Sequence, residues 1–450
     1  MKFKRVLAMA VTAVMTCSLL AGCGSSKTGA GSSESADSAG SGTEQNAAAA
    51  DTGSGEKTNL KFYIWSDEEN YISKVVEQYN AQSDSVHVEM ISIANDSYDD
   101  KLKVMMAAGD EADIVDIRGL AQVTQYRDTG SLMDLTDLVK NSELDISKYG
   151  AMWDSSYPDG QIFALPTRTT CWMLFYNPDL LEEAGVEMPE QLTWTEYAEM
   201  AKKLTKGDGP DKQWGGYWVD WHTQFMATQQ GVYVNADDVS AVQESLEMLN
   251  QLYNVDKTHM SLGEMKATDT QYLADFENKR AALMPQGEWM INMLLNDISA
   301  GKTDVNWEIA PMPIPDGVEP GTTWGQFQFA GITSTTKHPE ESFDFLKYLC
   351  GPEGAAIYAS TGMVHAYTDE GAEAAYKEAV GKDSVSVIFN AKKVQESPAS
   401  SNFDQILNIY KENSELYLLG EKTIEETMDN FLKQRDTVVQ KKKCQHVWKK

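Results

Sequence analysis

The stretch that decides the fold is "LKFYIWSDEENYISKVVEQYNAQSDSVHVEMISI", residues 60–93. In residues 60–65 every second side chain is apolar, which predicts a strand with one buried face. Residues 71–80 repeat apolar side chains at the spacing of one helix face, and residues 86–93 are typical of a second strand. The stretch therefore predicts a strand, a helix and a strand in succession, which is the unit of a parallel sheet.

The residues that follow extend this unit. Residues 98–108 form a second amphipathic pattern closed by Gly109, and "ADIVDI", residues 112–117, predicts a third strand. We therefore expect an α/β fold with a parallel sheet flanked by helices. Ligands of such sheets bind beyond the carboxyl ends of the strands. Residues 65–69 and 116–122 are therefore candidates for the ligand site.

The middle of the chain, residues 160–205, carries clear helix-capping signals. Asn177 and Pro178 are typical of the N-cap and first residue of a short helix ending at Gly185. Thr193 and Glu196 have the spacing of a capping box, which predicts a second helix after it. One face of that helix carries Trp194, Tyr197, Ala201 and Leu204.

The same stretch resembles a known family signature, Asp-Gly-x-x-x-x-Leu-Pro followed by Tyr-Asn-x-Asp-Leu, Ala-Gly, Pro and Thr-Trp-x-Glu. It is matched by Asp159, Gly160, Leu165, Pro166, Tyr176, Asn177, Asp179, Leu180, Ala184, Gly185, Pro189, Thr193, Trp194 and Glu196. The family is that of the extracellular solute-binding proteins of ABC importers, in the sugar-binding group related to maltose-binding protein. Later stretches, "FENKRAALMPQGEWM" and "WEIAPMPIPDG", resemble it too, although Asn278 and Ala112 stand where the family usually has Gly and Pro.

This resemblance implies a two-lobed periplasmic-binding-protein-like fold, each lobe a sheet flanked by helices, with the ligand cleft between the lobes. Matched positions imply that the chain crosses between lobes near 165–168, 326–330 and 351–353. The expected boundaries are 58–165 plus 330–350 for lobe 1, 166–329 plus 351–440 for lobe 2, and 441–450 for a basic tail. Such crossings permit hinge closure around a ligand.

The N-terminus has the pattern of a targeting segment. Basic residues precede an apolar run, and Leu20–Ala21–Gly22–Cys23 matches the bacterial lipoprotein box. We expect a signal peptide over residues 1–22, with retention of the run as a membrane span as the alternative. Lipidated Cys23 would then anchor the protein to the outer face of the cell membrane. Residues 23–57, rich in Gly, Ser and Ala, are predicted to be a flexible tether.

Composition excludes several classes of ligand. The formal net charge is −30, and phosphate binding needs clustered Lys and Arg, so neither nucleic acid nor an anionic lipid surface is expected as a ligand.

Besides Cys17 and Cys23, the chain has three cysteines, Cys171, Cys350 and Cys444, an odd and widely spaced set that is no disulfide framework. None of the six histidines has zinc-ligand spacing, so no metal and no cofactor are expected.

Planar aromatic side chains are the first candidates for a carbohydrate site, because an indole face can cover a sugar ring. "GGYWVDWHTQF", residues 215–225, has no regular period. We expect Trp221 to be a stacking platform, with loop packing as the alternative, and Trp218 to be core, with stacking as the alternative. Trp289 matches the family position that faces the sugar, with a core residue at a helix start as the alternative. Trp324 and Gln326 lie beside an expected crossing, where binding and packing are equally plausible. Trp194 and Trp307 are assigned to packing.

Polar candidates follow the strand ends, since carboxylate, amide and guanidinium groups pair with hydroxyls. Trp65, Asp67 and Glu68 follow the first strand, although the acids are equally consistent with a solvated helix start. Asp116 and Arg118 end the third strand, where the family resemblance places hydroxyl-binding groups. Arg168 can fork two hydroxyls or pair with an acid across the lobes.

These observations predict a non-enzymatic, monomeric receptor that captures a carbohydrate, expected to be an oligosaccharide, and delivers it to an ABC permease. A surface lectin or adhesin is the alternative, and a glycoside hydrolase a further one. A hydrolase needs two carboxyls across a cleft. Because the chain has 68 acidic residues, candidate pairs of carboxyls are no evidence for a hydrolase. The sequence has no Gly-x-Ser-x-Gly, His-Glu-x-x-His or P-loop motif.

Overall fold

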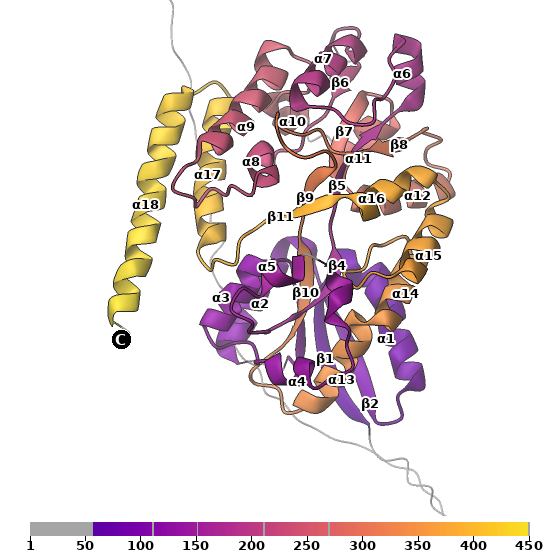
Figure 1. Ribbon diagram of the computed structural model, residues 1–450, viewed down its shortest axis with the longest axis vertical. Coiled ribbons are helices and arrows are strands. Elements are labelled where there is room, and N and C mark those ends of the chain that lie inside the picture. The colour runs from indigo at the N-terminus through magenta and orange to yellow at the C-terminus, as the bar shows by residue number, and fades with distance from the viewer. Residues whose placement is uncertain (1–56, 110–111, 151, 210–211, 269–270, 449–450) are drawn as a thin grey trace, which may run out of the picture. The chain divides into compact units, whose positions relative to one another are not determined.

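The computed structural model describes residues 57–448 except 110–111, 151, 210–211 and 269–270, with side chains as far as residue 440. The signal peptide, Cys23 and all but the last residue of the tether lie outside the described residues. The described part contains two main sheets, each with its own hydrophobic core (Figure 1). This arrangement agrees with the expected two-lobed α/β fold.

The sheet of lobe 1 has five strands in the order β2-β1-β3-β10-β4. Their bounds are β1 Thr58–Trp65, β2 Val86–Ile93, β3 Ile114–Ile117, β4 Leu165–Thr169 and β10 Phe327–Ile332. Strand β1 pairs in parallel with β2 and β3, as the alternation of strands and helices predicts. Strand β10 returns antiparallel between β3 and β4, so the sheet is mixed.

Helices cover the sheet of lobe 1 on its faces (Figure 1). Their bounds are α1 Glu69–Gln82, α2 Asn95–Ala108, α3 Leu120–Asp128, α4 Thr136–Lys140, α5 Met152–Ser156, α13 Pro339–Cys350 and α14 Pro352–Ser360. Helix α2 ends at Gly109 as predicted, because Gly109 adopts the left-handed conformation at φ 67°. Helix α1 buries the predicted stripe against the strands, with Ile72 and Val75 fully inaccessible.

The sheet of lobe 2 has four strands in the order β6-β7-β5-β8. Their bounds are β5 Trp172–Tyr176, β6 Trp214–Gly216, β7 Ala281–Gly287 and β8 Glu308–Ala310. The helices that accompany them are α6 Pro178–Ala184, α7 Trp194–Leu204, α8 Phe225–Gln229, α9 Ser240–Asn250, α10 Leu262–Thr268, α11 Tyr272–Glu277, α12 Trp289–Ser299, α15 Glu370–Val380 and α16 Ser386–Asn390.

The capping signals of this lobe are confirmed. The Asn177 side chain accepts a hydrogen bond from the Leu180 amide, and Pro178 is the first residue of α6. Thr193 and Glu196 make both hydrogen bonds of the capping box at the start of α7. These local signals fix where α6 and α7 begin, and both helices then pack on the sheet.

The chain passes between the sheets at three places in its described part. The first is Thr170–Cys171 between β4 and β5, the second is Gln326 between β9 (Thr322–Gly325) and β10, and the third lies between α14 and α15. The predicted boundaries differ from these. They place Pro166–Thr169, Phe327–Phe329 and α14 in lobe 2, whereas β4, β10 and α14 all contribute to the core of lobe 1. The reason for α14 is its packing on α1, where Tyr358 meets Tyr71 edge to face at 4.8 Å.

The C-terminal part of the chain adds a third, smaller core. Strand β11, Lys392–Gln395, pairs with β9, and helices α17, Phe403–Leu418, and α18, Ile424–Trp448, follow it. Phe431 of α18 and Tyr410 of α17 are fully buried in this core beside α9 (Figure 1). The backbone of the predicted basic tail continues α18 as far as Trp448.

Candidate functional site

A cavity of about 660 Å³ is lined by both lobes. Lobe 1 contributes the start of α2 and the loop after β3, lobe 2 contributes the loop after β6, and Gln326 comes from the second crossing. The start of α17 closes one side. The lining residues are Asn95, Asp96, Asp99, Lys103, Arg118, Gly119, Ala121, Gln122, Trp221, His222, Gln224, Gln326, Glu396, Ser397, Phe403, Asp404, Leu407, Asn408 and Lys411.

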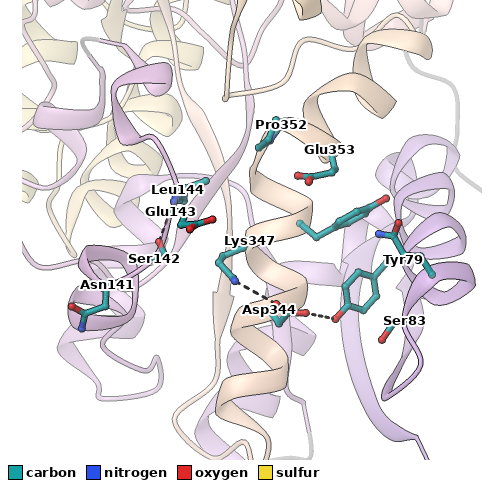
Figure 2. Close-up of a pocket in the computed structure, with 12 residues that line it drawn as sticks. Tyr79, Ser83, Asn141, Ser142, Glu143, Leu144, Asp344, Lys347, Pro352 and Glu353 are labelled. Atoms are coloured by element: carbon teal, nitrogen blue, oxygen red, sulfur yellow. Dashed lines mark hydrogen bonds and ion pairs between the residues drawn. The ribbon is translucent and has the colours of Figure 1, made fainter.

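A second cavity, of about 620 Å³, has a different origin (Figure 2). All of its lining residues belong to lobe 1, from α1, the segment after α4, α13 and the start of α14. Lys347 pairs with Asp344, which also accepts a hydrogen bond from Tyr79. Its walls cannot move apart by hinge motion. A third cavity, of about 690 Å³, has residues of both lobes in its lining, Thr169 and Gln229 among them, but no tryptophan. The cavity that contains Trp221 is therefore the candidate ligand site.

Trp221 is the aromatic side chain that the interlobe cavity exposes. Its relative exposure is 40 %, and its ring packs edge to face on Tyr272 at 5.8 Å. The loop is held by Trp218, which is fully buried and whose Nε1 donates to the backbone oxygen of His222 at 2.9 Å. Trp218 therefore lies in the core and Trp221 at the cavity.

Arg118 reaches the cavity from the end of β3. Its guanidinium lies over the ring of Trp65 at 4.4 Å, donates to Asp99 Oδ1 at 3.1 Å and donates to Asn95 Oδ1 at 2.7 Å. Trp65, a predicted ligand residue, is only 2 % exposed because this guanidinium covers it. The cation therefore lines the cavity with most of its hydrogen bonds already made.

Gln326 lies where the first and second crossings meet. Its backbone N–H donates to Thr170 Oγ1 at 2.8 Å, and the Thr170 N–H donates to the Gln326 carbonyl at 2.9 Å. Its side chain extends toward Gly119, where an added Cβ would lie 2.9 Å from Gln326 Oε1. Gln326 thus places an amide at the cavity while its backbone ties the crossings together.

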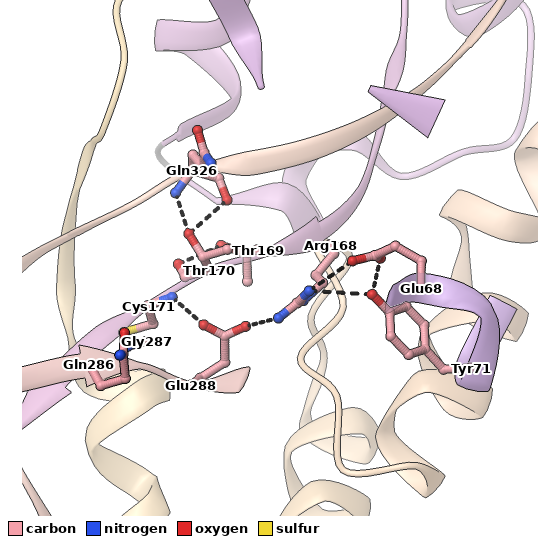
Figure 3. A network of polar contacts seen from close by, with 10 residues as sticks. All are labelled: Glu68, Tyr71, Arg168, Thr169, Thr170, Cys171, Gln286, Gly287, Glu288 and Gln326. Carbon is pink, nitrogen blue, oxygen red and sulfur yellow. Dashed lines mark hydrogen bonds and ion pairs between the residues drawn. The ribbon is translucent and has the colours of Figure 1, made fainter. Parts of the chain in front are cut away.

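Three other predicted charged residues, Arg168, Glu68 and Asp116, are buried and do not line this cavity. Arg168 donates to Glu68 Oε1 at 3.2 Å and to Glu288 Oε1 at 2.6 Å, with every member of this triad less than 5 % exposed (Figure 3). Arg168 therefore pairs with an acid of the opposite lobe, the second of the two roles expected for it, and Glu68 is engaged by Arg168 instead of facing a ligand. Asp116 is also buried, 1 % exposed.

Burial changes the proton affinity of these acids. It raises the pKa of Glu68 to about 7, against the opposing effect of the Arg168 charge. Burial raises the pKa of Asp116 well above its usual range, with the charge of Glu68 acting in the same direction. Neither oxygen of the Asp116 side chain has a hydrogen-bond partner among the described residues. A protonated Asp116 is the form that such a site favours.

Three further predicted residues have distinct positions. Trp324 is fully buried, 4.9 Å from the parallel ring of His222 and 5.1 Å from that of Trp172, which corrects its assignment as a residue facing the cleft. Asp67 is exposed after β1. Trp289 is half-buried at the start of α12, with its ring 5.4 Å from that of Trp172.

Sequence reasoning missed several residues of the cavity. His222 Nδ1 lies 3.4 Å from Glu396 Oε1, and Gln224 Nε2 lies 3.4 Å from the same imidazole nitrogen. Burial lowers the pKa of Lys411, while the charge of Glu396 raises it. His222 and Gln224 follow Trp221 in the same loop, so the sequence pattern that identified Trp221 could also have identified them. Lys411 belongs to an ordinary amphipathic helix that carries no motif.

The described residues hold neither a metal-binding cluster nor a membrane-crossing helix. They contain no group of three or more His, Cys, Asp or Glu side chains arranged to hold a metal ion. Among them, no helix combines the length and the apolar character that crossing a bilayer requires.

Comparisons with known proteins agree with this geometry. A curated relative, the arabinooligosaccharide-binding protein of Halalkalibacterium halodurans, is 25 % identical over 211 residues, 42 % of this chain and 44 % of the relative. The chain therefore aligns with less than half of that relative. The sn-glycerol-3-phosphate-binding periplasmic protein of Brucella abortus is 24 % identical over 327 residues, 66 % of this chain and 72 % of the relative.

A solved structure and a family pattern extend the comparison. The crystal structure of a sugar transporter from Rhizobium etli, in an open conformation, superposes with a TM-score of 0.76 at 26 % identity and covers 84 % of this chain and 99 % of that one. The sequence pattern of one family matches residues 65–356, which include most of both sheets and the lobe 1 and lobe 2 walls of the cavity. The chain belongs to the bacterial extracellular solute-binding protein family.

Proposed function

We propose that the chain is a lipid-anchored receptor that captures an oligosaccharide between its lobes by hinge closure and delivers it to an ABC importer. The observation that carries this proposal is the cavity of about 660 Å³, lined by both lobes, into which Trp221 exposes its indole. Its volume falls within the range of small-molecule sites. Closure would exclude water from both the ring face and the hydroxyl contacts.

The side chains at the cavity favour a carbohydrate. Trp221 offers a flat apolar face, and Gln326, Gln224 and Asn408 offer amides that both donate and accept hydrogen bonds. This mixture suits a sugar, which has apolar ring faces and hydroxyls around its edge. The arabinooligosaccharide-binding relative supports the same class of ligand.

The charges at the cavity favour a neutral sugar over a phosphate ester. Arg118 is paired with Asp99 and bonded to Asn95, and Arg168 is buried in its triad. Lys411 lies near Glu396 and Asp404, and Lys103 lies near Asp404 and 3.8 Å from Asp100. Since bidentate recognition of phosphate needs a guanidinium with free donors, a neutral oligosaccharide fits better than glycerol phosphate.

The proposal is tested by a thermal-shift screen of the mature protein, followed by calorimetry. Arabino-, xylo- and malto-oligosaccharides are the probes, with sn-glycerol 3-phosphate as the charged comparison. An oligosaccharide is expected to raise the melting temperature. At one hundred times Kd the free energy of unfolding increases by about 2.7 kcal/mol. A shift with the phosphate ester alone would contradict the ligand class.

Two further measurements separate the alternatives. Hinge closure predicts a smaller radius of gyration with ligand by small-angle scattering, whereas a lectin would bind without that change. Chromatography after prolonged incubation should recover the oligosaccharide intact, and released products would favour a glycoside hydrolase.

The membrane anchor has its own test. Mass spectrometry of the mature N-terminus is expected to show a diacylated Cys23, and Cys23→Ala should release the protein from the membrane fraction. A Cys17→Ala variant is the matched control, because this cysteine lies within the expected signal peptide. An unmodified Cys23 in the mature protein would contradict the anchor.

A further inference from the structure

The triad of Glu68, Arg168 and Glu288 joins the two lobes at the first crossing (Figure 3). Arg168 is on β4 in the sheet of lobe 1, and Glu68 follows β1 in the same lobe. Glu288 directly follows β7, a strand of lobe 2. The ion pair of 2.6 Å between Arg168 and Glu288 therefore spans the crossing at Thr170–Cys171.

Glu288 is fixed to lobe 2 by two hydrogen bonds. Its Oε2 accepts from the Cys171 N–H at 2.8 Å, and its own N–H donates to the Cys171 carbonyl at 3.0 Å. The next residue, Trp289, begins α12. A displacement of Arg168 relative to Glu288 is therefore a displacement of lobe 1 relative to lobe 2, close to where the hinge turns.

The triad holds two carboxyls and one guanidinium away from water. Its side chains are at most 5 % exposed, and Tyr71 donates its hydroxyl proton to Glu68. Two buried carboxylates that share one cation leave a net negative charge, which is costly in a poorly solvated site. One proton on Glu68 makes the triad neutral, and the pKa of Glu68, raised by burial to about 7, makes that proton available near neutral pH.

Other charged and titratable groups face Glu68 from every side. They are Asp67 beside it, Asp116 and Arg118 from β3 and its end, Arg168 from β4, Glu288 before α12, Tyr71 of α1 and Tyr358 of α14. Of these, Glu288 is the acid contributed by the opposite lobe. Its repulsion of an ionised Glu68 is the interaction that depends on how the lobes are placed.

We propose that Glu68, Arg168 and Glu288 are positioning residues that act as a proton-sensitive clasp, so that one proton at Glu68 favours the arrangement of lobes seen here and makes ligand binding depend on pH. The effect on binding rests on the proposed function, because it requires a ligand that touches both lobes. The effect of the proton on the relative placement of the lobes does not depend on the proposed function.

The direction of the pH effect follows from the charges of the triad. Protonation of Glu68 removes the repulsion between the two acids and leaves Arg168 paired with Glu288 across the crossing. The arrangement seen here therefore binds the proton more tightly than one with the lobes apart, and acid pH favours it. Because one proton is involved, ligand affinity can change by at most tenfold per pH unit. We expect Kd to differ several-fold between pH 6 and pH 8.

The experiment compares wild-type protein with Glu68→Gln, which carries a permanently neutral side chain of the same shape. Asp67→Asn is the matched control, since Asp67 is the adjacent exposed acid. Small-angle scattering of ligand-free protein is expected to give different radii of gyration at pH 6 and pH 8 for wild type and Asp67→Asn, and equal values for Glu68→Gln. Calorimetry with the oligosaccharide found in the screen should show the same pattern in Kd.

The outcomes are distinct. Equal radii for wild type at both pH values, or a pH dependence that survives in Glu68→Gln, would overturn the clasp. If Glu68→Gln does not fold, Glu288→Gln replaces it, because this variant keeps an acceptor for the Cys171 N–H and also removes the repulsion. A radius that depends on pH and on Glu68, with no oligosaccharide bound, would support the clasp while contradicting the proposed ligand class.

Discussion

At the scale of single residues, two tryptophans three positions apart have opposite roles. Trp218 is fully buried between Trp194 and Phe225, whose rings lie 5.4 and 4.4 Å away. Trp221 keeps 40 % of its surface exposed at the cavity. The same side chain thus supplies packing energy at one position and a binding surface at the other.

This difference gives a direct test. Trp221→Ala is expected to weaken oligosaccharide binding at least about fivefold, since one stacked ring contributes about 1 kcal/mol or more, with little change in the melting temperature of ligand-free protein. Trp218→Ala, the control, should cost about 3 to 5 kcal/mol of the free energy of unfolding. Denaturant titration and calorimetry measure the two quantities. Large instability in Trp221→Ala would assign this residue to the core.

The site could be predicted from the sequence only where neighbours in the chain determine it. Trp221 lies in an irregular loop that the sequence already marks. Trp65 was expected at a strand end open to ligand, but Arg118 from another strand covers it. Trp324 is buried by His222 and Trp172, which are far from it in the chain. Contacts of this kind do not appear in any local pattern.

At the scale of elements, the first two crossings are in close backbone contact. A Cβ added at Gly325, the last residue of β9, would lie 2.0 Å from the carbonyl oxygen of Thr170. The segment after α14 runs beside them, with the Thr169 N–H donating to the Val364 carbonyl at 3.3 Å. The three connections between the lobes are therefore neighbours, which allows one lobe to turn on the other as a unit.

Gly325→Ala is expected to force the first two crossings apart and to cost about 1 to 3 kcal/mol of the free energy of unfolding. The control is Gly263→Ala in α10, where the nearest atom to an added Cβ is 3.7 Å away and a change of less than about 1 kcal/mol is expected. Urea unfolding of both variants measures the difference. Equal stability of the two would contradict the close contact of the crossings.

Element positions were the most predictable part of the fold. Asn177, Pro178, Thr193 and Glu196 act through bonds to residues within one turn, so their effect is visible in the sequence. Lobe boundaries were displaced by a few residues at β4 and β10, and by a whole helix at α14. The assignment of α14 depends on its contact with α1, nearly three hundred residues earlier in the chain.

At the scale of the whole molecule, two buried histidines make stability depend on pH. Burial lowers the pKa of His259 to about 3 and that of His365 to about 4. Both remain neutral in the folded state, while the unfolded chain takes up protons below about pH 6.5. Their contribution to stability is therefore present above pH 6.5 and is lost as pH falls toward 4 and 3.

Replacement of one histidine should remove its share of this dependence. From pH 7 to pH 5, the free energy of unfolding of wild type is expected to fall by about 2 kcal/mol more than that of His259→Gln. Comparison of the two proteins cancels the opposite effect of Glu68, which is common to both. His87→Gln, at an exposed position of β2, should leave the dependence unchanged. Urea unfolding at the two pH values measures it, and parallel curves for wild type and His259→Gln would contradict the prediction.

The order of strands in the sheet of lobe 1 has a consequence for the newly made chain. The four strands of the other sheet all lie between Trp172 and Ala310, so a ribosome completes them before it reaches β10 at Phe327. Until then β3 has no partner on the side that β10 later occupies. A bare strand edge is a template for association with other chains, so the N-terminal half of the newborn polypeptide is where a chaperone would be needed.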